Sequence, residues 1–228
     1  MNKVSINENI DKIRERIASA AHRAGRQPEE IKIVAVAKNV ATEAVFQALE
    51  AGITDIGENR VQEAGERYEI IKSKFPFAAW HMIGHLQRNK VGQALDIFDI
   101  IQSVDSERLV EEIYKRAVKP VPILIEVNTS GETSKFGIGI DKTIDLVRFA
   151  ASFDKIKVLG LMTIGPLVDD PEKARPSFRK LKELRDKIID LNLPSAEMKF
   201  LSMGMTDDFE VAIEEGSNLV RIGRGIFY

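Results

Sequence analysis

The stretch IKIVAVAKNVATEAVFQALEAG, residues 31–52, joins a run of apolar, mostly β-branched residues to a segment with helical spacing. Runs of the first kind recur along the chain, and helical segments separate them. Because these runs are apolar throughout, they are typical of parallel strands that are buried on both faces. We count eight of them, at residues 33–36, 53–56, 78–83, 98–101, 121–127, 158–162, 200–203 and 219–222.

The helical segments have recognisable ends. Thr42 is a candidate cap for the helix that Gly52 ends, and Asp170–Pro171 marks the start of a long helix. Asp207 followed by Glu210 has the spacing of a capping box. Since strand and helix alternate along the whole chain, we predict a (β/α)₈ TIM barrel rather than an open, doubly wound sheet.

The two ends of the sequence favour a closed ring. Residues 7–24 have the pattern of an amphipathic helix, and Gly25 follows as a stop. Tyr228 comes a few residues after the eighth run, so no ordinary eighth helix follows. In a barrel, the N-terminal helix would cover the seam between the first and eighth strands. We therefore expect one α/β domain over residues 1–228, with an N-terminal helix closing the ring.

The composition limits the partners of the protein. Its 228 residues carry 33 Lys and Arg against 35 Asp and Glu, a net charge of -2, which gives no long-range attraction to nucleic acid or to an anionic membrane. The absence of cysteine excludes disulfides and thiolate chemistry. No apolar stretch has the length of a signal peptide or a membrane span. We expect a cytoplasmic protein that binds small molecules, not nucleic acid or membrane.

Polar residues follow the predicted strands, where the active site of a barrel forms. Lys38 comes directly after the first apolar run. At the mouth of a barrel, apolar walls would disfavour its charged form, and a neutral amine can form a Schiff base with an aldehyde. Alternatively, Lys38 reaches into solvent or pairs with Glu58.

The last two loops have the composition of a phosphate site. Ser202-Met203-Gly204-Met205 leads into a helix, and Arg221-Ile222-Gly223-Arg224 supplies a glycine and two guanidinium groups. The loops after the seventh and eighth strands commonly bind phosphate in this fold, although such glycines can also serve tight turns alone. We predict a phosphate site there.

The three histidines do not have metal-ligand spacing, and we predict no metal site. His81 lies inside an apolar run, so we interpret it as a hydrogen-bonded core residue. His85 follows Gly84 and is expected at the barrel mouth.

These strand ends resemble the pyridoxal phosphate homeostasis proteins, the YggS/PROSC family, whose barrel is similar to the N-terminal domain of alanine racemase. The matching segments run in order along nearly the whole chain, and the last is highly specific. They are IVAVAKN (33–39), DIGENRVQE (55–63), WHMIGHLQRNK (80–90), QSVDS (102–106), EVNTSGETSKFG (126–137), GLMTIGP (160–166) and LSMGMTDDFEVAIEEGSNLVRIGRGIF (201–227).

The resemblance implies that pyridoxal 5′-phosphate (PLP) is held as a Schiff base on Lys38. It also implies an arginine, Arg221, near the pyridine ring, where it would weaken the cofactor as an electron sink. Two neighbours of the lysine depart from the family pattern, because Ala37 replaces a usual serine and Asn39 a usual threonine or tyrosine. The implied cofactor-binding residues are Lys38, Asn59, Ser202, Met203, Arg221, Gly223 and Arg224.

Three functions are compatible with such a site. The first is a monomeric carrier that holds PLP for cellular homeostasis, has no catalytic residues of its own, and supplies PLP-dependent apoenzymes. It is favoured because a racemase on this barrel takes its second base from a further domain, which the resemblance does not include.

The second is a PLP-dependent amino-acid racemase that takes this base from His85 or Lys135. The third is a Schiff-base aldolase acting on a phosphorylated sugar without cofactor. Lys135 could instead accept the aldehyde from Lys38 during transfer.

Overall fold

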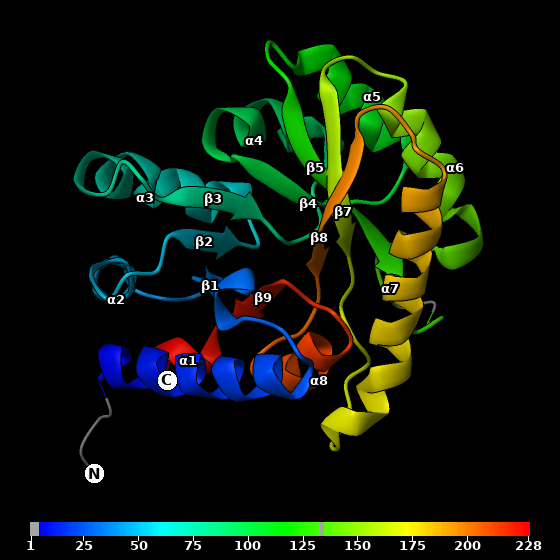
Figure 1. Ribbon diagram of the computed structural model, residues 1–228. Coiled ribbons are helices and arrows are strands. Elements are labelled where there is room, and N and C mark those ends of the chain that lie inside the picture. The colour runs from blue at the N-terminus through cyan, green and yellow to red at the C-terminus, as the bar shows by residue number, and fades with distance from the viewer. Residues whose placement is uncertain (1–4, 133–134) are drawn as a thin grey trace.

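The computed structural model describes residues 5–132 and 135–228, and eight parallel strands in it form a closed ring. The ring closes because β9 pairs with β1 and β5 pairs with β4 (Figure 1). This confirms the predicted (β/α)₈ TIM barrel. Its strands are β1 (Lys32–Val36), β2 (Asp55–Glu58), β3 (Ala79–Met82), β4 (Ile100–Val104), β5 (Val121–Asn128), β7 (Ile156–Met162), β8 (Ala196–Ser202) and β9 (Leu219–Ile222).

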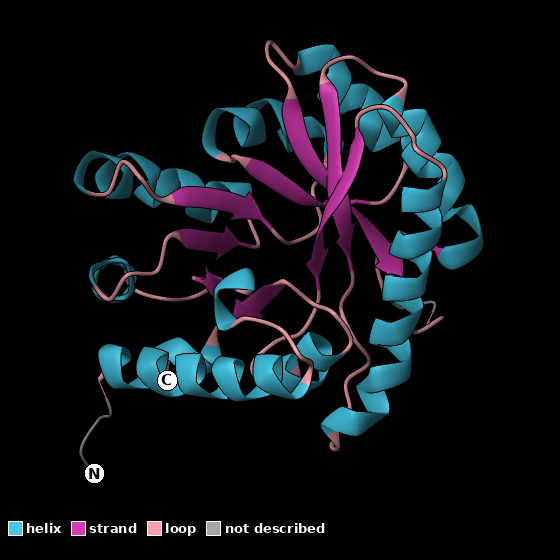
Figure 2. Cartoon of the chain, viewed as in Figure 1, coloured by secondary structure: helices cyan, strands magenta, loops and turns pink. Residues whose placement is uncertain are grey.

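Helices surround the strands, as Figure 2 shows. In the described part of the chain, none of them is long and apolar enough to cross a membrane. They are α1 (Ile6–Arg23), α2 (Thr42–Glu50), α3 (Val61–Lys74), α4 (Val91–Ile97), α5 (Glu107–Arg116), α6 (Ile140–Ala151), α7 (Arg175–Asp190), α8 (Phe209–Glu214) and α9 (Arg224–Phe227).

Helix α1 covers the seam of the ring, beside α8 and α9 (Figure 1). Its isoleucines, among them Ile13, are buried in one apolar cluster with Phe209 of α8 and Val220 of β9. A capping box between Ser5 and Glu8 begins the helix. The N-terminal helix therefore closes the barrel, as the sequence predicts.

Two predicted helix caps are wrong. Ala41 is the N-cap of α2, and Thr42 is its first helical residue. Asp208, not Asp207, precedes α8, and its carboxylate accepts a hydrogen bond from the Met205 N–H at 2.6 Å instead of capping the helix. The carboxylate therefore closes the loop after β8. Asp170 caps the 3₁₀ turn Pro171–Ala174, accepting from the N–H of Glu172 at 3.0 Å, and the long helix α7 begins after this turn, at Arg175.

The strands differ from the predicted runs mainly at their ends. Strand β4 extends to Val104 because the polar residues Gln102 and Ser103 are buried within it. Strand β8 begins at Ala196, earlier than predicted, because exposed charged residues alternate there with buried ones. The two-residue strand β6 (Ile138–Gly139) beside β5 was not predicted.

Alternate strand residues face the inside of the barrel. One interior cluster is apolar and includes Leu124, Phe200 and Leu219. Two positions further along β8 and β9, toward the carboxyl ends, stand the buried polar residues Ser202 and Arg221. The barrel interior is thus apolar around Leu124, Phe200 and Leu219. It becomes polar toward the carboxyl ends of the strands, where a functional site is expected.

Candidate functional site

Lys38 lies in the turn that follows β1 and is exposed. Asn39 next to it has a left-handed backbone with φ 57°, a conformation that asparagine tolerates better than most residues. Lys38 opens onto a cleft of about 720 Å³ that Asn59, His85 and Lys90 also line. The ends of β1, β2 and β3 therefore meet around the lysine amine.

Arg67 of α3 holds the Lys38 turn through hydrogen bonds to its backbone. The guanidinium donates to the carbonyl of Val40 at 2.9 Å and to that of Ala37 at 3.4 Å. It also lies 3.5 Å from the carboxylate of Glu58, which is fully buried. Glu58 thus pairs with Arg67, and the predicted alternative of an ion pair with Lys38 is wrong.

The environment of Glu58 is unusually apolar for a carboxyl group. Burial raises its pKa to about 7, although the nearby charge of Arg67 acts in the opposite direction. Neither of its oxygens has a hydrogen-bond partner within residues 5–132 and 135–228. The pair beneath the Lys38 turn is therefore sensitive to protonation near neutral pH.

Asn59 follows β2 and lines the cleft beside Lys38. Its side-chain oxygen is buried, and no hydrogen-bond partner for it occurs among the described residues. Gly84 of the next loop packs against it, since a Cβ there would lie 2.4 Å from the Asn59 carbonyl oxygen. Only glycine fits this contact. Asn59 thus lines the cleft and keeps a buried amide oxygen that no described residue bonds.

Arg221 of β9 is buried inside the barrel. It donates to the hydroxyl of Ser202 at 2.5 Å and to the carbonyl of Thr163 at 2.8 Å. Burial lowers its pKa to about 10, and the carboxyl groups of Glu126 and Asp208 partly offset this. Arg221 therefore remains a cation at neutral pH and concentrates positive charge at this level of the barrel.

Glu126 of β5 is a buried carboxyl group close enough to Arg221 to affect its charge, and the sequence analysis did not single it out. It is buried, and burial together with the charge of Asp105 raises its pKa to about 7, against the effect of Arg221. The available signal in the sequence was its position in the long, mostly apolar strand β5, because burying a carboxyl group costs free energy unless the group is paired.

The predicted phosphate loops bring some of their residues together and separate others. Gly204 has φ +92°, and a Cβ there would lie 2.6 Å from Cβ of Ala212, so glycine lets the loop approach α8. Gly223 precedes α9, whose first N–H groups have no partner within the helix. Met203, however, packs in the apolar core, and exposed Arg224 pairs with Asp207.

The histidines occupy the two expected environments. His81 is fully buried and bonded on both ring nitrogens, which confirms a core histidine. His85 stands at the mouth, where its ring stacks on Phe136 with centroids 4.4 Å apart. No cluster of metal-binding side chains occurs in the described ranges.

Lys135, the other candidate base, is engaged with its own surroundings. Its amine donates to the Gly165 carbonyl at 3.0 Å and lies 2.8 Å from the Glu132 carboxylate. Residues 133 and 134 of the same family-like segment lie outside the described residues.

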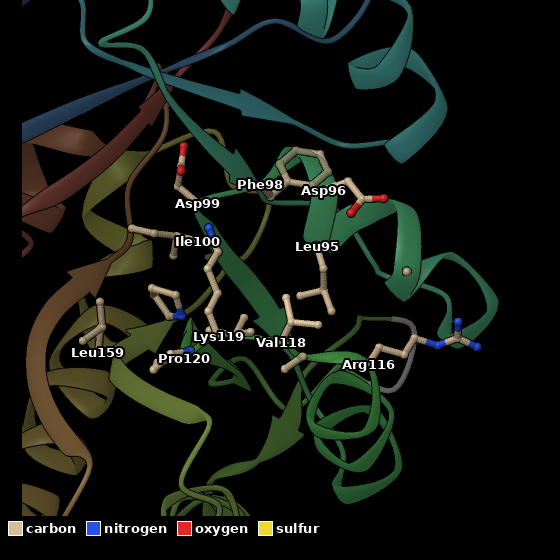
Figure 3. A pocket seen from close by; sticks show the side chains of 14 residues that line it. Leu95, Asp96, Phe98, Asp99, Ile100, Arg116, Val118, Lys119, Pro120 and Leu159 are labelled. Carbon is tan, nitrogen blue, oxygen red and sulfur yellow. The ribbon is translucent and has the colours of Figure 1, made fainter.

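A second pocket, of about 730 Å³, lies at the opposite end of the barrel. Its walls are mostly apolar and come from the amino ends of β4 and β5 and the end of α5, including Phe98 and Val118 (Figure 3). It holds none of the polar groups described above. The functional site of a barrel forms at the carboxyl ends, so the Lys38 cleft is the candidate.

Comparisons place this site in a class of barrels. The family model of the alanine racemase N-terminal domain matches residues 8–228. A Bifidobacterium adolescentis protein, described only as an unknown protein, has a TM-score of 0.94 at 37% identity, over 97% of this chain and 94% of that one. Alanine racemase from Corynebacterium glutamicum has a TM-score of 0.73 at 13% identity, over 98% of this chain and 62% of that one, and shares the fold alone.

Closer relatives narrow the class. The pyridoxal phosphate homeostasis protein of Aquifex aeolicus is 42% identical over 223 residues, 96% of each chain. Its Escherichia coli K12 counterpart is 33% identical over 226 residues, 97% of this chain and 95% of that one. The chain belongs to the family of pyridoxal phosphate homeostasis proteins. PipY of Synechococcus elongatus, solved with PLP bound, has a TM-score of 0.82 at 29% identity, over 95% of this chain and 100% of that one.

Proposed function

We propose that this protein binds PLP as a Schiff base on Lys38 and serves as an intracellular carrier of the cofactor. The observation that carries the proposal is the exposed Lys38 amine, held by a clamped turn at the carboxyl end of the barrel, in a family with a PLP-bound member. When bound, PLP would supply an aldehyde that captures an amine.

The groups around Lys38 fit such a cofactor. Asn59 lines the same cleft, and its buried side-chain oxygen has no partner in the described structure. Arg221 provides a fixed cation, and an arginine beside a pyridine nitrogen keeps that nitrogen unprotonated. At the start of α9 the N–H of Gly225 already donates to Thr206 Oγ1 at 3.3 Å, so a phosphate would meet the backbone around Gly223 and Arg224.

Two residues that are expected to contact the phosphate, Ser202 and Arg224, already bond to other groups in the structure. The hydroxyl of Ser202 already bonds to Gln102 and Arg221, so Ser202 would meet a phosphate through its backbone or after exchanging a partner. Arg224 would have to leave Asp207. Met203 contributes through the course of its loop rather than its side chain, which is buried in the core.

The test is an absorbance titration of the purified protein with PLP, followed by borohydride reduction and mass analysis of peptides. We expect a new visible band and a covalent adduct on the Lys38 peptide. Lys38→Ala should lose both. Lys90→Ala is the matched control, because Lys90 lines the same cleft. No band in the wild type at saturating PLP would contradict the proposal.

The carrier function is separated from catalysis by activity assays. A buffer releases PLP to an apoenzyme without turning over amino acids, so reactivation of an apo-aminotransferase by the loaded protein should proceed while racemisation of alanine stays at background. Ordinary racemase turnover would contradict the carrier.

A racemase is the second candidate, and the position of His85 in the Lys38 cleft favours it. His85→Ala should then abolish any racemisation without affecting the absorbance band. Lys135 is a weaker candidate for the base or for transfer, because its amine is bonded elsewhere. Unchanged PLP release in Lys135→Ala would remove it from transfer.

A further inference from the structure

Five buried side chains form a line of hydrogen bonds through the barrel interior, each from a different strand. The Arg221 guanidinium donates to Ser202 Oγ at 2.5 Å. The Ser202 hydroxyl donates to Gln102 Oε1 at 2.6 Å. Gln102 Nε2 lies 2.8 Å from His81 Nδ1, and His81 Nε2 lies 2.9 Å from Asp55 Oδ1. The line connects the cofactor side of the barrel to the start of β2.

The charge of Asp55 determines the direction of these bonds. Burial alone would raise the pKa of Asp55, but hydrogen bonds from His81, Thr54 and Lys32 outweigh it and hold the pKa well below its ordinary value. A carboxylate only accepts, so the proton of His81 is on Nε2. Nδ1 then accepts from the amide of Gln102, whose oxygen must face Ser202.

All donors in the line therefore point the same way, from the Arg221 cation to the Asp55 anion. The hydroxyl hydrogen of Ser202 is committed to Gln102, and its oxygen accepts from Arg221. In a low-dielectric interior, each bond in such a chain polarises the next. The chain thus fixes both the guanidinium of Arg221 and the hydroxyl of Ser202.

We infer that Gln102 is a positioning residue of the cofactor site. Held from behind by His81 and Asp55, it orients Ser202 and Arg221. The effect on PLP rests on the proposed function, whereas the direction of the chain is a property of the protein without cofactor. Truncating Gln102 leaves His81 Nδ1 without its donor and the Ser202 hydroxyl without its acceptor, so Ser202 is no longer held in its orientation toward Arg221, which keeps only its bond to the Thr163 carbonyl as a fixed contact.

Ser103 provides a matched control on the same strand. It is the neighbour of Gln102 and is fully buried, but its hydroxyl has no hydrogen-bond partner in the described structure. Ser103→Ala therefore removes a buried oxygen from β4 without breaking the chain.

The experiment has two parts. Nitrogen-15 NMR of the cofactor-free wild type reports the His81 tautomer, and PLP titrations compare the wild type with Gln102→Ala and Ser103→Ala after their unfolding midpoints are measured. We expect the proton on Nε2, PLP affinity about tenfold weaker in Gln102→Ala, equivalent to about 1.4 kcal/mol, and a shifted absorbance maximum of the bound cofactor. Ser103→Ala should match the wild type in both.

The results separate the inference from the proposed function. A proton on Nδ1 of His81 would overturn the inferred direction of the hydrogen bonds. The NMR measurement that detects it uses the wild type alone. A folded Gln102→Ala with wild-type affinity and spectrum would overturn the positioning role; if that variant does not fold, Gln102→Asn takes its place. A wild type that shows the expected tautomer but binds no PLP would refute the proposed function. The inferred direction of the hydrogen-bond line would still hold.

Discussion

Arg67→Met should destabilise the protein by an amount that grows with pH. The substitution removes hydrogen bonds to the carbonyls of Ala37 and Val40, and each such bond contributes about 0.5–1.5 kcal/mol. It also leaves Glu58, which is fully buried, without its counter-charge. Removing one partner of a buried ion pair typically costs about 3–5 kcal/mol.

The sign of the pH dependence follows from Glu58. Its folded-state pKa is raised to about 7, so at pH 5 it is protonated and carries no charge to pair. At pH 5, Arg67→Met should therefore cost only the two carbonyl hydrogen bonds, about 1–3 kcal/mol. At pH 8 the wild-type carboxylate is mostly charged, whereas Glu58 of the variant avoids an unpaired charge by binding a proton, so the cost should exceed that at pH 5 by about 1 kcal/mol.

Urea unfolding at both pH values, followed by circular dichroism, measures this difference. In the double variant Arg67→Met/Glu58→Gln, the cost at pH 8 should fall back toward that at pH 5. Arg60→Met is the control, because its exposed pair with Glu63 should contribute at most about 1 kcal/mol. An equal cost of Arg67→Met at both pH values would refute the proposed pairing.

Three further substitutions test other parts of the structure. Gly84→Ala should destabilise by about 2 kcal/mol or more and weaken PLP binding, because its Cβ would meet the Asn59 carbonyl at 2.4 Å; thermal melts and PLP titration measure both. The folded-state pKa of Glu126 is raised from 4.5 to about 7, so wild-type stability should fall by roughly 3 kcal/mol as pH rises through that interval. In urea unfolding compared at pH 5 and 8, Glu126→Gln should remove this contribution and leave the one from Glu58, whose pKa is also raised to about 7, and an unchanged pH profile would contradict the shift. Arg175→Ala should lose about 1–2 kcal/mol at low salt and less at high salt, since Arg175 bonds Glu214 and Glu215 at the end of α8 as well as its own neighbour Glu172.

Strand boundaries show where sequence patterns reach their limit. The runs at 121–127 and 219–222 coincide closely with β5 and β9, because apolar residues flank the single charged residue in each run, Glu126 and Arg221. Strand β4 was predicted to end at Ile101, yet it includes Gln102 and Ser103. A polar residue inside a strand is indistinguishable from a loop residue unless its buried partner is known.

The candidate site shows the same division. Lys38 could be identified because it follows an apolar run, and Arg221 because it precedes a glycine in the last loop. Glu126, Gln102 and Arg67 could not, since their roles depend on partners from other strands or helices. Strand register brings Ser202 against Gln102 across 100 residues of sequence.

By itself, the sequence determined the eightfold alternation of strands and helices, the helix that covers the seam, and the lysine at the barrel mouth. These follow from local periodicity and from the rule that parallel strands end on one face. Only the tertiary structure decided that Glu58 pairs with Arg67 rather than Lys38, and that a line of hydrogen bonds ties Arg221 to Asp55. The reason is physical: a buried polar group takes its charge and orientation from the neighbours that the closed barrel places around it.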